Sequence, residues 1–458
     1  MIRKRSIFRR INNLAGKAII FTLAAFLVFT FSCQLFEEQA EEEAPVEEFE
    51  TVTGESKEEL VEDAVAILEI SIWESLGPKE RLALMGSIED FLAEYPLINI
   101  EARHFRNQEE LMDQFEAASL AGSGPEIILV DFNGVFRLAP ENVVKEITDE
   151  VDYYDILDGL VEISEYNGRK YIIPFRATDP LMFFYNKSLM ENVPNDFEEV
   201  IEYCKEKNNF EEQIYGFLLN VNEPDWVIPF IGGYSDWIVD YNTDSITLDT
   251  EAAKKTLDFL YYIYNEEKVL PYGLGYEDIN TLFKKGNAHM VINGLWAIDE
   301  YKEEGIDFGI SKIPKVWGGY KYPTPLTSGL GFMINTNCYG NKLEGTKNFV
   351  DYMLLENVQV EWTFNTQTLP ILKNIDENTS IENDDFIFNA MQQAKICRGE
   401  PNEEIIRVIR DALRINLENV INGNITSEEA VLKIQEDAIK LRAGSITVEE
   451  LKEEELED

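Results

Sequence analysis

Apolar and polar residues follow one another along this chain in a pattern that predicts strands and helices in regular succession. Strand-like runs cover Ala64–Trp73, Ile98–Phe105 and Glu126–Val130, and the segments between them, 78–95 and Gln108–Ala121, have the apolar spacing of amphipathic helices. A strand that is apolar on both faces must be covered on both faces, and a helix follows each of the first two strands. We therefore predict an α/β fold built on a parallel sheet.

The same succession continues through the rest of the chain. Two further strands are predicted at Tyr171–Pro174 and Met182–Tyr185. Further helices are predicted near residues 196–206, 251–267, 276–285, 344–355, 403–422 and 426–442. Thr426 and Glu429 form a capping box that opens the last of these helices. A chain of 458 residues is too long for one ordinary core, so two lobes are expected.

The N-terminal segment has the pattern of an export signal. Basic residues precede the apolar run Ala18–Phe31, which is shorter than the roughly 20 residues needed to cross a bilayer. Ser32 and Cys33 follow and resemble a bacterial lipobox, in which cleavage before the cysteine leaves a thiol that carries lipid. We predict that residues 1–32 are a lipoprotein signal peptide and that Cys33 anchors the protein outside the cell membrane. Ordinary secretion and an uncleaved anchor are the alternatives.

The charge of the chain is strongly acidic. It has 86 Asp and Glu against 40 Lys and Arg, a net charge of −46. Residues 33–63 are predicted to be an acidic flexible tether, and residues 446–458 an acidic tail. Such a charge excludes nucleic acid and anionic membrane surfaces as partners. Because self-repulsion of this size is tolerable when salt screens it, a saline habitat is favoured.

The residues that commonly carry out catalysis are scarce. The only histidines are His104 and His289, which argues against histidine catalysis and zinc chemistry, so no metal and no cofactor are predicted. Besides Cys33, the cysteines Cys204, Cys338 and Cys397 allow at most one disulfide. Neither a Gly-x-Ser-x-Gly motif, a P-loop nor a dinucleotide fingerprint is present. The chain is predicted not to be an enzyme, although a secreted glycoside hydrolase remains an alternative because acids are abundant.

Six segments in fixed order carry a family resemblance. They are AGSGPEIILVD (Ala121–Asp131), NGRKYIIPFRATDPLMFFYNK (Asn167–Lys187), EPDWVIPFIGG (Glu223–Gly233), FKKGNAHMVINGLWAI (Phe283–Ile298), IDFGISKIP (Ile306–Pro314) and TSGLGFMIN (Thr327–Asn335). In this order and spacing they resemble the bacterial extracellular solute-binding proteins of the sugar-binding cluster, maltodextrin-binding proteins above all. The resemblance covers about residues 64–442.

The resemblance implies a two-lobed periplasmic-binding-protein fold with a hinge of chain crossings and an interlobe ligand cleft. Lobe 1 would hold residues 64–178 and 329–375, and lobe 2 residues 179–328 and 376–445. Such a protein would act as a monomer, close on an oligosaccharide and deliver it to the transmembrane subunits of an ABC importer permease. A polyamine and glycerol phosphate are alternative ligands.

Sugars present hydroxyl groups at their edges and apolar C–H groups on their faces, so a sugar site needs polar side chains and flat aromatic rings. Trp296 stands where maltodextrin-binding proteins place a stacking tryptophan, and a core position is its alternative. Asp179 stands at the first chain crossing, where the family places a ligand-binding acid. A salt bridge to Arg176 is its alternative.

Further candidates follow from the resemblance and from strand ends. Glu223, Asp225 and Trp226 match a ligand-contacting Glu-Pro-aromatic stretch of the family, and the alternative for Trp226 is packing against Phe230. The remaining candidates stand at strand ends or at a crossing, where open α/β sheets bind ligands; they are Glu74, Ser75, Asp131, Asn133 and Ser328. An Asx turn is the alternative at Asp131 and Asn133.

Three positions depart from the maltodextrin pattern. Asp225 replaces the first aromatic residue of its stretch, Val130 stands in place of a tryptophan, and Gly134 in place of an arginine. The expected ligand is therefore the class of oligosaccharides and not maltose in particular.

Overall fold

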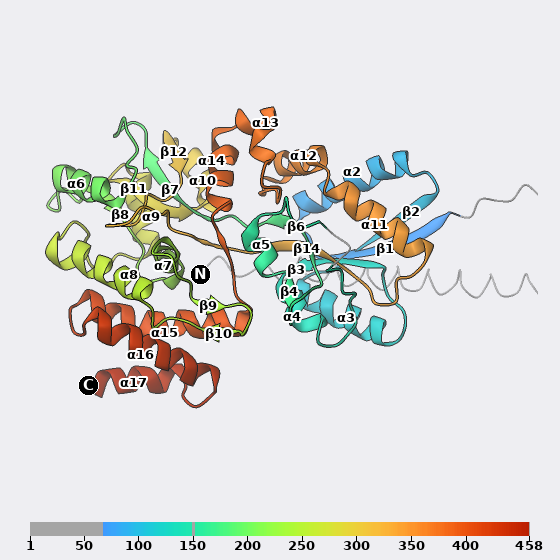
Figure 1. Ribbon diagram of the computed structural model, residues 1–458. Helices are drawn as coiled ribbons and strands as arrows, with labels where there is room; N and C mark the ends of the chain where they lie inside the picture. The colour runs from blue at the N-terminus through green and yellow to red at the C-terminus, as the bar shows by residue number, and fades with distance from the viewer. Residues whose placement is uncertain (1–66, 149–151, 458) are drawn as a thin grey trace, which may run out of the picture. The chain divides into compact units, whose positions relative to one another are not determined.

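The computed structural model describes residues 67–148 and 152–457, which form two β-sheets with helices packed on them (Figure 1). Cys33, the predicted signal peptide and the predicted tether lie outside the described residues. We call each sheet, together with the helices packed on it, a lobe. This arrangement is the two-lobed α/β fold expected from the sequence.

The sheet of lobe 1 has the strand order β2-β1-β3-β14-β6. Its strands are β1 (Leu68–Glu74), β2 (Ile98–His104), β3 (Ile127–Asp131), β6 (Ile173–Ala177) and β14 (Gly329–Ile334). The first three run parallel, whereas β14 is antiparallel to β3 and β6. The helices of this lobe are α2 (Pro78–Glu94), α3 (Gln108–Leu120), α11 (Asn341–Met353) and α12 (Glu356–Thr366).

The apolar run in strand β3 is explained by the cores on both of its faces. Ile127 and Leu129 face the core that α2, α11 and α12 cover, while Ile128 and Val130 face the core under α3. All four side chains are fully buried. Burial on both faces therefore requires a continuous apolar run instead of an alternating one.

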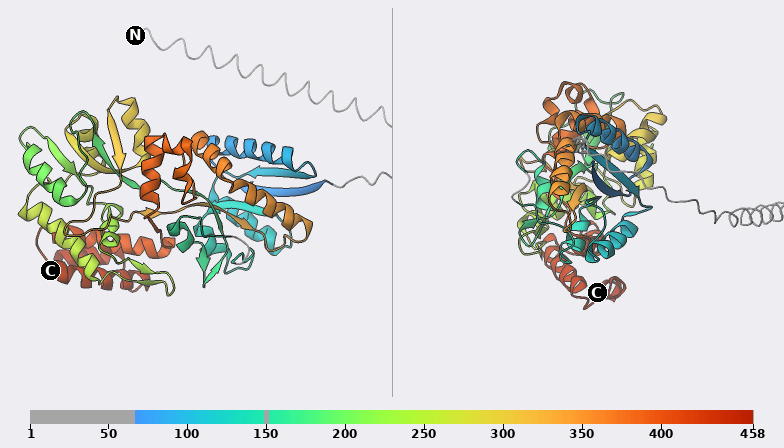
Figure 2. Two further views of the ribbon diagram at one scale, coloured as in Figure 1. Left: turned by 45° about the horizontal axis from the view of Figure 1, so that its top comes forward. Right: turned by 90° about the vertical axis from the view of Figure 1, so that its right-hand side faces the viewer.

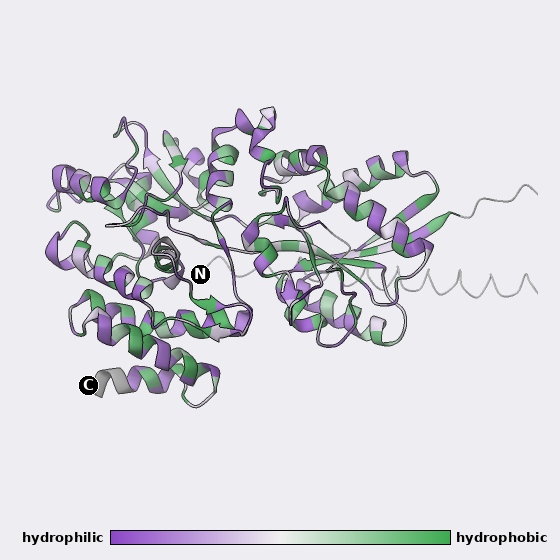
Figure 3. Cartoon of the chain, viewed as in Figure 1, coloured by the Kyte–Doolittle hydropathy of each residue, from purple (hydrophilic) through white to green (hydrophobic). Residues whose placement is uncertain are grey.

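The sheet of lobe 2 has the order β12-β7-β11-β8. Its strands are β7 (Leu181–Asn186), β8 (Tyr215–Leu218), β11 (Ala288–Gly294) and β12 (Phe308–Ser311). Its main helices are α6 (Phe197–Lys207), α8 (Glu251–Tyr261), α9 (Tyr276–Lys284), α10 (Ile298–Glu303), α14 (Asp385–Ala394), α15 (Glu403–Ile421) and α16 (Ser427–Arg442). Figure 2 turns both lobes to show the helices on either side of the sheets, and Figure 3 shows most helices banded in hydrophilic and hydrophobic colours. Such banding is expected of helices that bury one face.

Shorter elements complete the described chain. They are α4 (Asn133–Leu138), α5 (Asp158–Glu162), β4 (Glu165–Tyr166), β5 (Arg169–Lys170), η1 (Pro224–Trp226), α7 (Ile228–Gly233), β9 (Val239–Asp240), β10 (Ser245–Ile246), η3 (Leu295–Ala297), β13 (Leu326–Thr327), η4 (Ile375–Glu377), α13 (Thr379–Glu382) and β15 (Arg398–Gly399).

Two chain crossings between the lobes lie side by side. One joins β6 to β7 and the other joins β13 to β14. Thr178 N donates to Ser328 O over 2.8 Å, and Ser328 N donates back to Thr178 Oγ1 over 3.0 Å. A Cβ atom on Gly329 would lie 2.0 Å from Arg176 O, so only glycine permits this close approach.

The structure differs from the sequence-based prediction in two helical regions. The helix expected over 251–267 ends at Tyr261, and the next turn, η2 (Tyr262–Glu266), is a π-helix. Residues 446–458, for which the sequence predicted an acidic tail without a helix, contain the acidic helix α17 (Val448–Glu457). Leu451 is 2% exposed and joins the core of lobe 2, and Val448 packs against the same core, so two apolar side chains anchor this acidic helix.

Cys204, Cys338 and Cys397 are buried free thiols, so these three cysteines do not form the one disulfide that their number would allow. Among the described helices, none combines the length and the apolar composition that crossing a membrane requires.

Candidate functional site

Three aromatic side chains gather beside the end of strand β11. Trp226 Nε1 donates to Ile292 O over 2.8 Å, and Trp296 Nε1 donates to Tyr276 Oη over 3.1 Å. The rings of Trp226 and Trp296 meet edge to face, with their centroids 6.4 Å apart. Both indole N–H groups are therefore used within the protein, which fixes the orientation of the rings.

Trp296 is the exposed member of this aromatic cluster. It is 53% exposed, although it is a large hydrophobic residue. A Cβ atom on Gly294 would lie 1.9 Å from its ring, so the indole rests against the backbone of this glycine. Trp296, which lies in η3 directly after β11, thus presents a fixed aromatic face and is not a core tryptophan.

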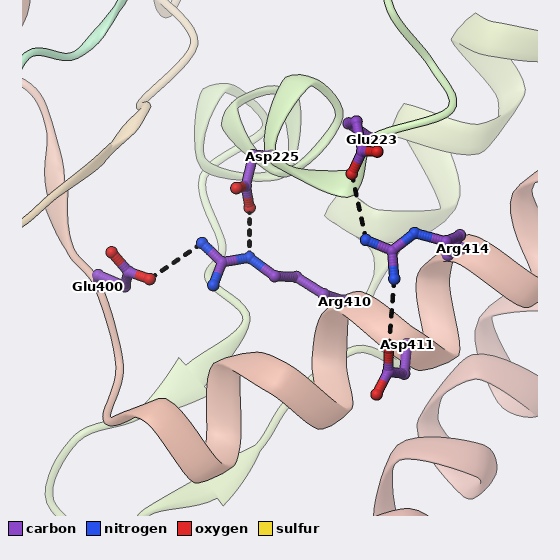
Figure 4. A network of polar contacts seen from close by, with 6 residues as sticks. All are labelled: Glu223, Asp225, Glu400, Arg410, Asp411 and Arg414. Atoms are coloured by element: carbon purple, nitrogen blue, oxygen red, sulfur yellow. Dashed lines mark hydrogen bonds and ion pairs between the residues drawn. The ribbon is translucent and has the colours of Figure 1, made fainter. Parts of the chain in front are cut away.

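A network of ion pairs lies on the same lobe (Figure 4). Arg410 on α15 reaches two acids, since its Nε donates to Asp225 Oδ1 over 2.7 Å and its Nη2 to Glu400 Oε1 over 2.9 Å. Arg414, one turn further along α15, pairs with Glu223 over 3.1 Å and with Asp411 over 3.2 Å. The carboxylates of Glu223 and Asp225, both predicted to contact the ligand, are therefore paired with arginines within the protein.

A hollow of about 290 Å³ adjoins this network. Phe132, Asn133 and Phe136 line it from lobe 1, and Ser328 lines it at the second crossing. The remaining lining residues come from lobe 2 and include Glu400, Glu403, Arg407, Arg410, Asp411 and Arg414. A ligand in this hollow would contact both lobes and meet mostly polar groups.

Asp131 is the last residue of strand β3, and one of its carboxylate oxygens is buried without a hydrogen bond to any described residue. Its Oδ1 atom has no hydrogen-bond partner in the part of the chain that the structure describes. Burial raises the pKa of its carboxyl, and the N–H groups of Asn133 and Gly134 oppose that rise. These hydrogen bonds fit the Asx turn considered above.

Asp179, on the first crossing, is a second, half-buried acid. Burial raises the pKa of its carboxyl to about 6, and the nearby positive charge of Arg176 opposes the rise. Arg176 itself pairs with Glu80, with 2.6 Å between Nε and Oε1. A carboxyl with a raised pKa at a cleft is a candidate for ligand contact.

An Asp179→Asn variant is expected to be more stable than the parent protein at neutral pH. A carboxyl whose folded pKa is raised stabilises the fold below its unfolded pKa, and this contribution is lost as pH rises through the folded pKa. For Asp179 the loss falls between the ordinary value of 3.8 and about 6. At about 1.4 kcal/mol per pKa unit, it amounts to roughly 3 kcal/mol above pH 7.

Thermal unfolding of both proteins from pH 4 to pH 8 measures this difference. The advantage of the variant should grow with pH and vanish near pH 4. An advantage of equal size at every pH would contradict the assigned cause.

Glu74 and Ser75 lie at the end of β1. Glu74 is fully buried and accepts a hydrogen bond from Leu76 N over 2.7 Å. His104 Nδ1 lies 3.1 Å from its carboxylate and Arg81 Nε 3.4 Å from it, so the acid is satisfied within its own lobe. Ser75 Oγ is buried and has no hydrogen-bond partner among the described residues.

Several residues of this region were missed at the sequence level. Tyr276, which orients Trp296, comes from a separate helix and has no motif. Arg407, Arg410 and Arg414 did carry a signal, because they recur at helical spacing in a chain that is poor in cations. That spacing alone would have predicted a basic stripe on α15.

Comparison with known proteins gives a family match over much of this chain. Residues 87–389 match the family model described as "Bacterial extracellular solute-binding protein". The maltotriose-binding protein of Pyrococcus abyssi is 23% identical over 385 residues, 82% of this chain and 83% of the relative. The galactooligosaccharide-binding protein of Bacillus subtilis is 22% identical over 332 residues, 69% of this chain and 77% of the relative. Both relatives are named as oligosaccharide-binding proteins.

Solved structures are similar to this chain over nearly their whole length. The maltose/maltodextrin-binding domain from Bdellovibrio bacteriovorus bound to maltotriose is 26% identical, with a TM-score of 0.56 over 82% of this chain and 99% of that chain. The extracellular solute-binding protein from Staphylococcus aureus in complex with maltose is 18% identical, with a TM-score of 0.71 over 83% and 99% of the two chains. The second likeness shows the shared fold.

Proposed function

Since this chain belongs to the bacterial extracellular solute-binding proteins, we propose that it captures an oligosaccharide between its two lobes for an ABC importer. The observation that carries this proposal is the fixed and exposed indole of Trp296. The same lobe carries the network of acids and arginines (Figure 4). The indole supplies the flat apolar surface that stacks on a sugar ring. The charged groups and Ser328 supply acceptors and donors for its hydroxyl edge.

On this proposal the protein binds its ligand without chemical change. Open and closed states exchange through the crossings near Thr178–Pro180, Ser328 and residue 375, and a ligand that contacts both lobes favours the closed state. The lobes would then hold residues 64–178 with 329–375 and residues 179–328 with 376–445. This division is supported by the strand membership of the two sheets.

Delivery to a permease completes the proposal. A lipid on Cys33 would hold the protein, as a monomer, outside the cell membrane, and residues 33–63 would let it reach the transmembrane subunits of the importer. The closed form would dock there and release the sugar.

The names of the relatives favour a sugar as the ligand, and the contacts of Asp225 bear on which sugar. Because Asp225 pairs with Arg410 where the maltodextrin pattern has an aromatic residue, this part of the site is polar and not a stacking surface. We therefore propose an oligosaccharide that is not necessarily built of maltose units. Three acids and three arginines line the hollow, so its charge does not select between a polyamine and glycerol phosphate, and both stay as second candidates.

A thermal-shift screen tests the proposed function. Maltose, maltotriose, longer maltooligosaccharides, galactooligosaccharides, spermidine and glycerol 3-phosphate would each be added at increasing concentration. A ligand at 100 times its Kd stabilises the fold by about 2.7 kcal/mol, so an oligosaccharide is expected to raise Tm by a few degrees. A rise with spermidine and none with any sugar would overturn the sugar proposal. Sugar cleavage during incubation would favour the glycoside hydrolase instead.

A further inference from the structure

A second hollow, of about 400 Å³, lies beside Trp296 and is not needed for the contacts described so far. It is lined by α10 and α14 of lobe 2, by the end of α12 of lobe 1 and by Asp179 on the crossing. Figure 1 shows α10, α12 and α14 close together at the top of the view. Its volume lies in the range of about 300–1,000 Å³ that is typical of small-molecule sites.

Two aromatic rings from opposite lobes line this hollow. Trp296 contributes from lobe 2, and Phe364 contributes from α12 of lobe 1. Phe364 is 44% exposed, so the core of lobe 1 does not use most of its surface. Its helix is nevertheless firmly held, because Trp362 is buried and Gln359 Nε2 donates to Phe175 O over 3.0 Å.

One polar group that lines the hollow lacks a hydrogen-bond partner within the described chain. Thr363 is 1% exposed and lines the hollow, yet its hydroxyl has no hydrogen-bond partner among the described residues. Leaving a buried hydroxyl unpaired costs stability, and a hydroxyl group of a bound sugar would supply the missing partner. The carboxyl of Asp179 and the ammonium of Lys302 add charged groups at the same hollow.

We propose that this hollow is an additional sugar subsite, in which Phe364 stacks on a unit of the oligosaccharide beyond the unit that contacts Trp296. This inference rests on the proposed function. The ligand would extend from the ion-pair network past Trp296 into the hollow, and longer chains would bind more tightly than disaccharides. Because the walls come from both lobes, a sugar unit held there also favours the closed state.

Isothermal titration of a Phe364→Ala variant tests the subsite. The probes are maltooligosaccharides of two to five units and the corresponding β-galactooligosaccharides. For the parent protein, Kd is expected to fall with chain length in the series that binds. Phe364→Ala should raise Kd about tenfold for the longest chain and less than twofold for the disaccharide. Phe364→Tyr, which keeps the ring, should restore most of the loss.

Two further variants separate binding from folding. Tyr320→Ala removes a ring that is 81% exposed and does not line this hollow, so its Kd values should match those of the parent at every length. Thr363→Val replaces the unpaired hydroxyl with a methyl group of similar shape. It should melt no lower than the parent and still bind the longest chain about threefold more weakly.

The outcomes distinguish this proposal from the proposed function. In one set of outcomes, the parent protein binds oligosaccharides while Phe364→Ala weakens the binding of all chain lengths equally, or of no chain length. Either result would refute the subsite and leave the proposed function intact. The subsite is also wrong if the parent gains nothing with length. If the parent binds no oligosaccharide at all, the proposed function fails, and the subsite fails with it.

Discussion

A Trp296→Ala variant is expected to bind oligosaccharide about fiftyfold more weakly than the parent, while unfolding at nearly the same temperature. Trp296 is 53% exposed in the absence of ligand, so its removal leaves no cavity in the core. A stacked sugar would cover much of this exposed surface. Covering an aromatic side chain is worth roughly 2–3 kcal/mol, and fiftyfold corresponds to about 2.3 kcal/mol.

Titration calorimetry with the best sugar of the thermal-shift screen measures this loss. Gly294→Ala is a matched companion, because its new Cβ atom would lie 1.9 Å from the indole and would displace the ring without deleting it. This variant should bind more weakly than the parent and more tightly than Trp296→Ala. The stacking role would be refuted if Trp296→Ala bound within threefold of the parent, or if it melted far below it.

Much of lobe 1 was predictable because local patterns determine it. The apolar run at Ile127–Asp131 is a strand buried on both faces, and the helix predicted at 78–95 is α2 (Pro78–Glu94). What the pattern did not determine is the direction of β6 and β14 in the sheet. That direction depends on where the chain crosses between lobes, which is a long-range property.

The candidate site was predictable to a similar degree. Ordered segments identified Trp296 and Asp179, and both line the hollow beside α12. The partner of Asp225 was not predictable, because Arg410 lies 185 residues away and nothing local selects it among 40 basic residues. Helix α17 was missed for a related reason. Its composition is acidic, and the burial of Leu451 depends on contact with helices that precede it in the chain.

Removal of Arg410 is expected to have the largest effect on stability among the changes to the ion-pair network. Arg410→Ala would leave Asp225 and Glu400 without the cation that each contacts in the partly buried network. Breaking a fully buried ion pair costs about 3–5 kcal/mol, and an exposed pair about 0.2–1 kcal/mol. For this partly buried network we expect a loss of about 2 kcal/mol, because it lies between these limits.

The control for this prediction stands one turn earlier on the same helix. Arg407 is 59% exposed and meets Asp411 only at 3.6 Å, so Arg407→Ala should cost less than about 0.5 kcal/mol in urea unfolding. Equal losses in the two variants would show that Arg410 acts only as a surface charge.

The pH dependence of the Arg410→Ala loss identifies its cause. Burial already raises the pKa of Glu400, and the charge of Arg410 opposes that rise. Without the arginine the pKa of Glu400 in the folded protein should rise further. The folded variant would then keep a proton on Glu400 at pH values above 4.5, where the unfolded chain has released it. Stability of the variant is then lost as pH rises through the folded pKa, and its deficit should be larger at pH 8 than at pH 5. A deficit that is constant between these pH values would instead assign the loss to packing of the arginine side chain, with no role for the unpaired carboxylates.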